Sequence, residues 1–244
     1  MRTVCGIGRS VQRLLARRRS ERAPVPPVRL LRHPSRRAGR RPLVVDRLGP
    51  QRHAGAVLDQ VDATTCGSAV LVALAAWAEP AELERLDGAG RASAGAGTAA
   101  AVGFGVGFGA RYDVRQLQVH RESTKYWPAA LGTSPWGMVA WLRRNVPAAG
   151  PYRVRLVDDV SASDVAESIA VVDAALATGR PVPLLIGTFI PRHYVLAVGA
   201  GPAGWRVYEP SSGEVREVAR ELVRGRAIAG PLGFDRLHAV LVPT

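Results

Sequence analysis

From Gly179 to its end, the chain is dominated by five short runs rich in β-branched residues and separated by turn residues. The runs are RPVPLLIG, RHYVLAVGA, GWRVYEP, EVREVA and RLHAVLVP. Short runs of this composition, interrupted by glycine and proline, predict antiparallel strands joined by hairpins. The C-terminal part of the chain is therefore expected to form a sheet.

The preceding part has the patterns of helices. The segment TTCGSAVLVALAAWA, Thr64 to Ala78, is apolar almost all round, which predicts a buried helix with Thr64 or Thr65 as N-cap. Further helices are expected over residues 81–86, 112–119, 136–145 and 162–178, the last capped by Ser161 or Ser163. Helices followed by strands predict an α+β domain in which the first of these helices packs against the sheet.

Charge divides the chain into two parts. The net charge of +13 is concentrated in residues 1–50, which hold 14 basic residues and two acids, while residues 51–244 are nearly neutral at +1. Residues 1–42 are rich in arginine and proline, so we expect a mostly disordered tail with a short helix around SVQRLLARRR, followed by one domain over residues 43–244. Three interpretations of the tail stay open: a solvated tail, an electrostatic tether to nucleic acid or anionic membrane, or translated sequence upstream of the true start.

Several classes of protein do not fit the composition. No apolar run approaches the length of about 18 residues needed to span a bilayer, and the N-terminus lacks the apolar core of a secretory signal, which favours a cytoplasmic protein. Two cysteines make no disulfide framework, and neither a metal site nor a cofactor is expected. The glycines of GFGVGFGAR, residues 103–111, do not follow a nucleotide-binding pattern and predict a mobile loop.

Four residues have the types and positions that thiol chemistry requires. Cys66 lies in the first turn of the apolar helix, where backbone N–H groups and the helix dipole favour a thiolate. His193 begins a predicted strand and Glu209 ends the next, so a hairpin can bring the carboxylate to the imidazole. Gln60 stands six positions before the cysteine, where its amide can stabilise an oxyanion. Taken singly, each residue also fits an ordinary structural role.

The combination resembles the papain-like cysteine peptidases. DQVDATTCGSAVLV, RHYVLAVG and VYEP follow the order of the Q, CG, H and DP series found in the bacteriocin-leader-processing (double-glycine) branch. The resemblance implies a papain-like α+β fold, with Cys66 as nucleophile, His193 as base and then acid, Glu209 as orienter and Gln60 in the oxyanion hole. The family's third residue is usually Asp or Asn, so Glu209 is one methylene longer.

The expected function is a thiol hydrolase that cleaves a peptide or amide bond through an acyl-enzyme on Cys66. Two alternatives stay open: a catalytically inactive binding or scaffold protein, and an acyltransferase that uses the same residues. The tryptophan-rich stretch that contains Trp127, Trp136 and Trp141 is interpreted as core, with a substrate groove as the alternative.

Overall fold

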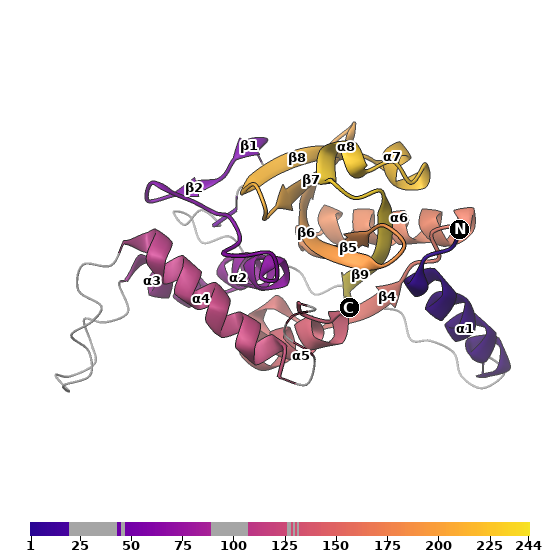
Figure 1. Ribbon diagram of the computed structural model, residues 1–244, viewed down its shortest axis with the longest axis horizontal. Helices are drawn as coiled ribbons and strands as arrows, with labels where there is room; N and C mark the ends of the chain where they lie inside the picture. The colour runs from indigo at the N-terminus through magenta and orange to yellow at the C-terminus, as the bar shows by residue number, and fades with distance from the viewer. Residues whose placement is uncertain (20–42, 45–46, 89–106, 126–127, 129, 131) are drawn as a thin grey trace.

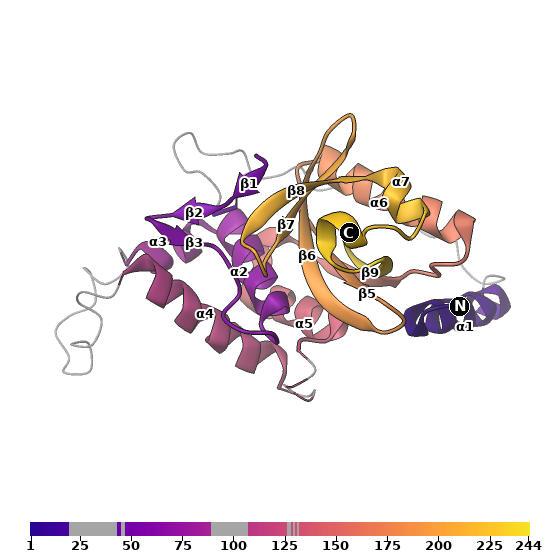
Figure 2. The ribbon, with the colours of Figure 1, turned by 45° about the horizontal axis from the view of Figure 1, so that its top comes forward.

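The computed structural model describes residues 1–19, 43–44, 47–88, 107–125, 128, 130 and 132–244. The described residues form an α+β fold built on a seven-stranded sheet, as expected for the class. Figures 1 and 2 show helices on both sides of this sheet. The candidate site residues come from both: Cys66 begins helix α2 (Cys66–Ala78), and His193 and Glu209 lie on strands of the sheet.

Every pairing in the large sheet is antiparallel. In spatial order, the strands are β1 (Gly49–Pro50), β8 (Glu214–Ala219), β7 (Gly204–Glu209), β6 (Pro191–Ala200), β5 (Val182–Gly187), β9 (Arg236–Pro243) and β4 (Tyr152–Leu156). The remaining strands, β2 (Arg52–His53) and β3 (Ala56–Val57), form a separate hairpin. The five C-terminal strands predicted from the sequence are confirmed. Strand β4, which pairs with β9, was not predicted from the sequence.

The helices divide between the two faces of the sheet. The bounds are α1 (Val4–Arg19), α2 (Cys66–Ala78), α3 (Pro80–Asp87), α4 (Phe108–Ser123), α5 (Pro135–Asn145), the 3₁₀ turn η3 (Pro147–Ala149), α6 (Ala162–Ala177), α7 (Arg220–Arg224) and α8 (Ala229–Leu232). Helix α2 packs on β6 and is joined there by α4 and α5, while α6 packs on the other face of β6 and on β9. The expected helices are therefore present, each within a few residues of its predicted bounds.

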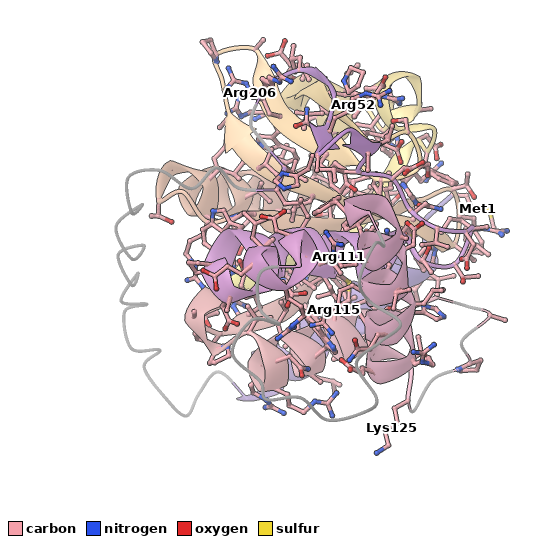
Figure 3. The ribbon with its side chains drawn as sticks, turned by 90° about the vertical axis from the view of Figure 1, so that its left-hand side faces the viewer. Met1, Arg52, Arg111, Arg115, Lys125 and Arg206 are labelled. Carbon is pink, nitrogen blue, oxygen red and sulfur yellow. The ribbon has the colours of Figure 1, made fainter. Side chains whose placement is uncertain are left out.

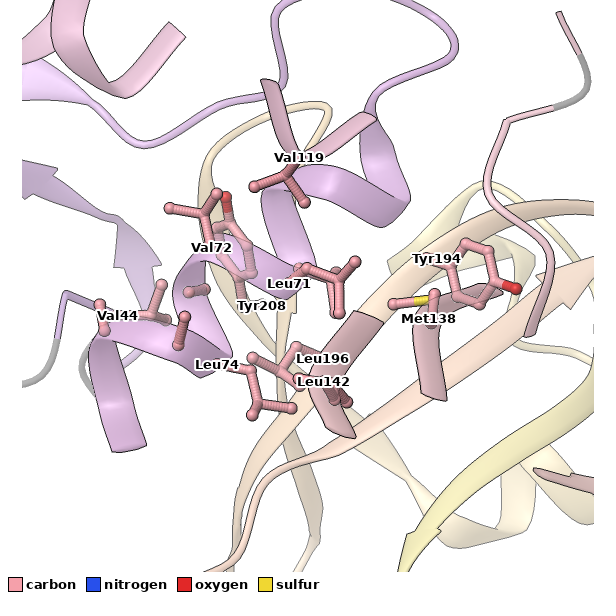
Figure 4. Close-up of a cluster of buried hydrophobic side chains, with 14 of the residues drawn as sticks. Val44, Leu71, Val72, Leu74, Val119, Met138, Leu142, Tyr194, Leu196 and Tyr208 are labelled. Carbon is pink, nitrogen blue, oxygen red and sulfur yellow. The ribbon is translucent and has the colours of Figure 1, made fainter. Parts of the chain in front are cut away.

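Two apolar layers stabilise the sheet, one on each face. The alternation of β6 separates them: Tyr194 and Leu196 join the α2 layer, and Val195 and Ala197 join the α6 layer. Figure 4 shows the α2 layer, in which side chains from α2, α4, α5 and the sheet meet: Leu71, Val72, Leu74, Val119, Met138, Leu142, Tyr194, Leu196 and Tyr208. Burial of α2 on nearly all sides explains why its sequence is apolar all round.

Two arginines of α4 bind to groups of α3. Arg115 of α4 donates to Glu82 of α3 over 2.6 Å, and Arg111 donates to the carbonyl of Leu86, also over 2.6 Å. Figure 3 shows both arginines on the side of the molecule formed by α4. Because Glu82 is buried, these charged bonds fix the position of α3 on α4.

The N-terminal segment differs from the expected disordered tail. Residues 4–19 form α1, which is longer than the short helix expected around residues 10–19, and α1 contacts β4 and β9. Its docking depends on buried acids far along the chain. Thr3 donates to Asp159 from its backbone N–H and its hydroxyl, over 2.9 and 2.8 Å. Residues 20–42 lie outside the described part of the chain.

Two smaller expectations have mixed outcomes. Most of the glycine-rich stretch lies outside the described residues, but Gly107 is the N-cap of α4 and Gly109 is already helical, so the expected loop ends earlier than predicted. Of the tryptophans, Trp141 is fully buried and Trp136 is 58% exposed, whereas Trp127 is not described. The core interpretation is therefore correct for Trp141 and wrong for Trp136.

The helices were also assessed for membrane-spanning character. Among the described residues, no single helix is both long and apolar enough to cross a bilayer. The pair α2 and α3 meets the length and composition requirements only when it is joined across a bend of 114°.

Candidate active site

Cys66 is the first residue of α2, which places its sulfur at the N-terminus of a buried helix. The preceding Thr65 is the N-cap by position, but its hydroxyl bonds back to the Asp62 carbonyl over 3.0 Å and makes no capping bond to the helix. Gly67 allows the first turn to pack closely, because a Cβ there would lie 3.2 Å from Thr133 and 3.3 Å from the Tyr194 ring. The first turn thus presents backbone N–H groups next to the thiol.

His193 and Glu209 meet at one end of the sheet. The distance between His193 Nε2 and Glu209 Oε1 is 2.6 Å, and both side chains are buried. Because Nε2 of the imidazole contacts the Glu209 carboxylate, Nδ1 is the ring nitrogen that can interact with the Cys66 thiol. The ring of Phe234 lies 5.7 Å from the imidazole, centroid to centroid, and packs against it. The imidazole is therefore held on two sides.

The turn that follows β7 holds the Glu209 carboxylate. Oε1 accepts the backbone N–H of Ser211 over 2.9 Å, and Oε2 accepts both the N–H and the hydroxyl of Ser212, each over 2.9 Å. The additional methylene of glutamate allows the carboxylate to reach over its own turn and still contact His193. Glutamate in this position is thus compatible with a close imidazole contact.

Both members of this pair have shifted pKa values. Burial alone would lower the pKa of His193, but interactions with the Cys66 thiol and with Glu209 outweigh burial and raise the pKa from 6.5 to about 9. Burial would raise the pKa of Glu209, but bonds from His193, Ser211 and Ser212 lower it from 4.5 to about 2. At neutral pH the pair is therefore an imidazolium and a carboxylate, with the thiol close to the cation.

Gln60 lies in the loop between β3 and α2, and its amide is engaged locally. Its Nε2 donates to the Asp62 carbonyl over 2.7 Å, and its Oε1 accepts the Ser211 hydroxyl over 3.2 Å. Only one of the two Nε2 hydrogens is used by Asp62, and the other is the one that an oxyanion would need. The structure places Gln60 beside the Glu209 turn and does not give it a direct contact with Cys66 among the described hydrogen bonds.

Three further bonds join the segments that precede α2 to β7 and the turn after it. The Tyr208 hydroxyl donates to the Leu58 carbonyl over 2.5 Å, and the backbone N–H of Gln60 donates to the Pro210 carbonyl over 2.7 Å. Further back, the N–H of Gln51 donates to the Gly213 carbonyl over 2.7 Å. These bonds connect the segment that leads to the thiol with the segment that carries the carboxylate, although about 150 residues separate them.

A pocket of about 270 Å³ opens beside the thiol. Its walls come from three places: the start of α2, the segment before α5 and the end of the β5–β6 hairpin. Its lining includes Cys66, Thr133, Ser134, Ile190 and Tyr194. The pocket therefore borders the N-terminus of α2, where Cys66 lies.

Several residues of the site were missed in the sequence analysis. Ser211 and Ser212 follow Glu209 directly, so the serines in EPSSG were a usable signal for donors to the carboxylate. Phe234, Thr133 and Tyr194 carried no such signal, since their places depend on tertiary packing.

Comparisons with known proteins do not extend this description. No protein-family model matches the chain, and neither the curated proteins nor the solved structures contain a significant match. No group of three or more His, Cys, Asp or Glu side chains among the described residues is arranged to hold a metal ion.

Proposed function

We propose that the chain is a papain-like thiol hydrolase that cleaves a peptide or amide bond through an acyl-enzyme on Cys66. The observation that supports this best is the 2.6 Å contact between His193 and Glu209 next to a thiol at a helix N-terminus. Reactive cysteines in general lie at helix N-termini or beside an imidazole, and Cys66 has both surroundings.

The residues divide the reaction between them. The Cys66 sulfur attacks the substrate carbonyl carbon, and the proton on His193 passes to the leaving amine when the C–N bond breaks. The neutral imidazole then takes a proton from water as the water attacks the thioester, and the thiol is released. Glu209 orients the imidazole and stabilises its charged form.

The oxyanion requires donors close to the sulfur. The backbone N–H of Cys66, at the uncapped start of α2, is the first candidate. The second hydrogen of the Gln60 amide is the other candidate, once the side chain turns from its loop. The inactive-scaffold alternative is less well supported, because a structural role does not require a buried imidazolium beside a thiol.

The test is alkylation by iodoacetamide at pH about 6, where ordinary thiols of pKa about 8.5 react slowly. The site of labelling is read by mass spectrometry. Cys66 should react at least about tenfold faster than a cysteine in an unstructured peptide, and His193→Ala should remove this advantage. Cys5 is an internal control, since burial and the charge of Asp159 raise its pKa to about 11 and it should stay unlabelled.

Peptide cleavage provides the second readout. The wild-type protein should cleave members of a mixed peptide library, and Cys66→Ala should abolish cleavage. If Cys66 reacts no faster than the free peptide, the proposal of an activated thiol is wrong. Rapid alkylation without cleavage would instead favour acyl transfer to another acceptor.

A further inference from the structure

Helix α1 exposes a continuous apolar face. Its large apolar side chains recur at spacings of three and four residues, which places them on one side of a helix. Each is between 47% and 62% exposed, and together they form the α1 apolar face: Val4, Ile7, Val11, Leu14 and Leu15.

The polar residues of α1 fix the direction of this face. Arg9 Nε donates to Asp164 over 3.2 Å, Arg13 Nη2 lies 2.7 Å from the same carboxylate, and Ser10 donates to Asp158 over 3.0 Å. Gly6 makes the closest approach, since a Cβ there would lie 2.9 Å from Asp159 Oδ1. Because these contacts occupy the opposite side of the helix, the apolar side is left exposed to solvent. Helix α1 itself lies at one edge of the molecule and contacts β4 (Figure 1).

The apolar face continues toward the pocket. The backbone N–H of Val4 donates to the Phe189 carbonyl over 3.2 Å, so α1 begins at the turn between β5 and β6. Phe189 and Ile190 of that turn are each 39% exposed, and Ile190 also lines the pocket beside Cys66. Exposed apolar side chains therefore extend from α1 to the edge of the candidate active site.

Charge indicates what can cover this face. Residues 1–50 carry 14 basic residues and two acids, and three consecutive arginines, 17–19, end α1. A second copy of the chain would bring two such segments together, and they would repel each other. Nucleic acid offers negative charge but no apolar surface to match the five aliphatic side chains. An anionic lipid surface offers both negative charge and acyl chains.

We propose that α1 and the β5–β6 turn form an interfacial site that binds anionic lipid membranes. The apolar face enters the boundary between headgroups and acyl chains, while the excess positive charge of residues 1–50 attracts anionic headgroups. The helix lies on the membrane and does not cross it. This arrangement sets the pocket of Cys66 close to the lipid surface, and it is independent of whether Cys66 is catalytic.

The experiment is sedimentation of the full-length protein with vesicles of phosphatidylcholine, with and without phosphatidylglycerol. The wild-type protein should sediment only with the anionic vesicles. The double variant Ile7→Gln/Leu14→Gln keeps the net charge, and its partition coefficient should fall by at least about tenfold. Val114→Gln is the matched control, because Val114 is an equally exposed apolar residue on α4, and its binding should not change.

Three results would overturn the proposal. Unchanged vesicle binding by the double variant would show that the arginines act alone. Concentration-dependent self-association of the wild-type protein, lost in the double variant, would identify a second copy as the occupant. Binding to duplex DNA that is as tight as wild-type binding to anionic vesicles, and that the double substitution does not weaken, would indicate a nucleic-acid partner.

Discussion

At the scale of single residues, the site depends on the two carboxylate oxygens of Glu209. They accept bonds from Ser211 and Ser212 in the turn that follows Glu209, and one of them also contacts His193. An aspartate at this position would have a shorter reach and could not satisfy both in the same backbone geometry. The choice of glutamate at this position is therefore explained by the turn that it supports.

The pH dependence of stability follows from the two shifted pKa values. The raised pKa of His193 adds stability that is fully present below about pH 6.5 and is lost as the pH rises through about 9. The lowered pKa of Glu209 adds stability that is present above about pH 4.5 and is lost as the pH falls toward about 2. We expect Glu209→Gln to reduce the pH dependence of the free energy of unfolding both above about pH 6.5 and below about pH 4.5. The measurement is urea unfolding at a series of pH values across this range.

The same variant should change the protonation of His193. Loss of the negative partner disfavours the imidazolium, so the pKa of His193 should fall by about one to two units, measured from its ring proton resonances. Glu221→Gln is the control, because Glu221 is an exposed residue of α7. A pKa that stays near 9 in Glu209→Gln would show that the carboxylate does not set the charge of the imidazole.

At the scale of elements, α1 is held by polar contacts. Its principal anchor is Asp164, which is fully buried at the start of α6 and accepts bonds from Arg9, Arg13 and Arg155. Asp164 also accepts the backbone N–H of Asp158 over 2.7 Å. A buried carboxylate with this many donors stabilises the docked helix only while all partners stay in place.

Removal of the charge at Asp164 should therefore release α1. We expect Asp164→Asn to lower the free energy of unfolding by about 3 kcal/mol, because the buried Arg155 loses its charged partner. It should also make α1 more susceptible to trypsin after Arg13. Glu167→Gln is the matched control, since Glu167 belongs to the same cluster but is 56% exposed, and we expect a change below about 1 kcal/mol. Equal protease resistance of wild type and Asp164→Asn would refute this role.

At the scale of the whole molecule, a buried arginine joins segments from different parts of the chain. Arg180 follows α6, and its Nη2 donates to the Ala149 carbonyl over 2.7 Å and to that of Pro151 over 3.3 Å. Its guanidinium lies over the Tyr152 ring, and Nη1 reaches the Thr244 carbonyl. One side chain thereby connects α6, β4 and the C-terminus.

Arg180→Lys should show how much this connection contributes. A lysine donates from a single point and cannot reproduce the planar fork, so we expect a loss of about 2 kcal/mol in the free energy of unfolding. The exposed Arg143→Lys on α5 should change it by less than about 0.5 kcal/mol. Comparable losses in the two variants would mean that Arg180 has no special structural role.

The sequence by itself determined the elements whose burial repeats along the chain. The all-round apolar pattern of residues 64–78 predicted α2, and the short β-branched runs after Gly179, separated by turn residues, predicted the five C-terminal strands. Both signals are local, because each element's composition and length can be seen within its own segment. The hairpin between His193 and Glu209 was also accessible, since only 16 residues separate them.

Only the tertiary structure decided how distant segments meet. The pairing of β4 with β9, the docking of α1 on Asp164, and the bond from Tyr208 to Leu58 join residues about 90 to 160 positions apart. Such contacts depend on the closure of long loops and on the fit of particular side chains, and neither leaves a local period in the sequence. The bond between Gln60 and Ser211, and the exposure of the apolar side of α1, likewise depend on how distant segments pack, so the sequence alone did not predict them.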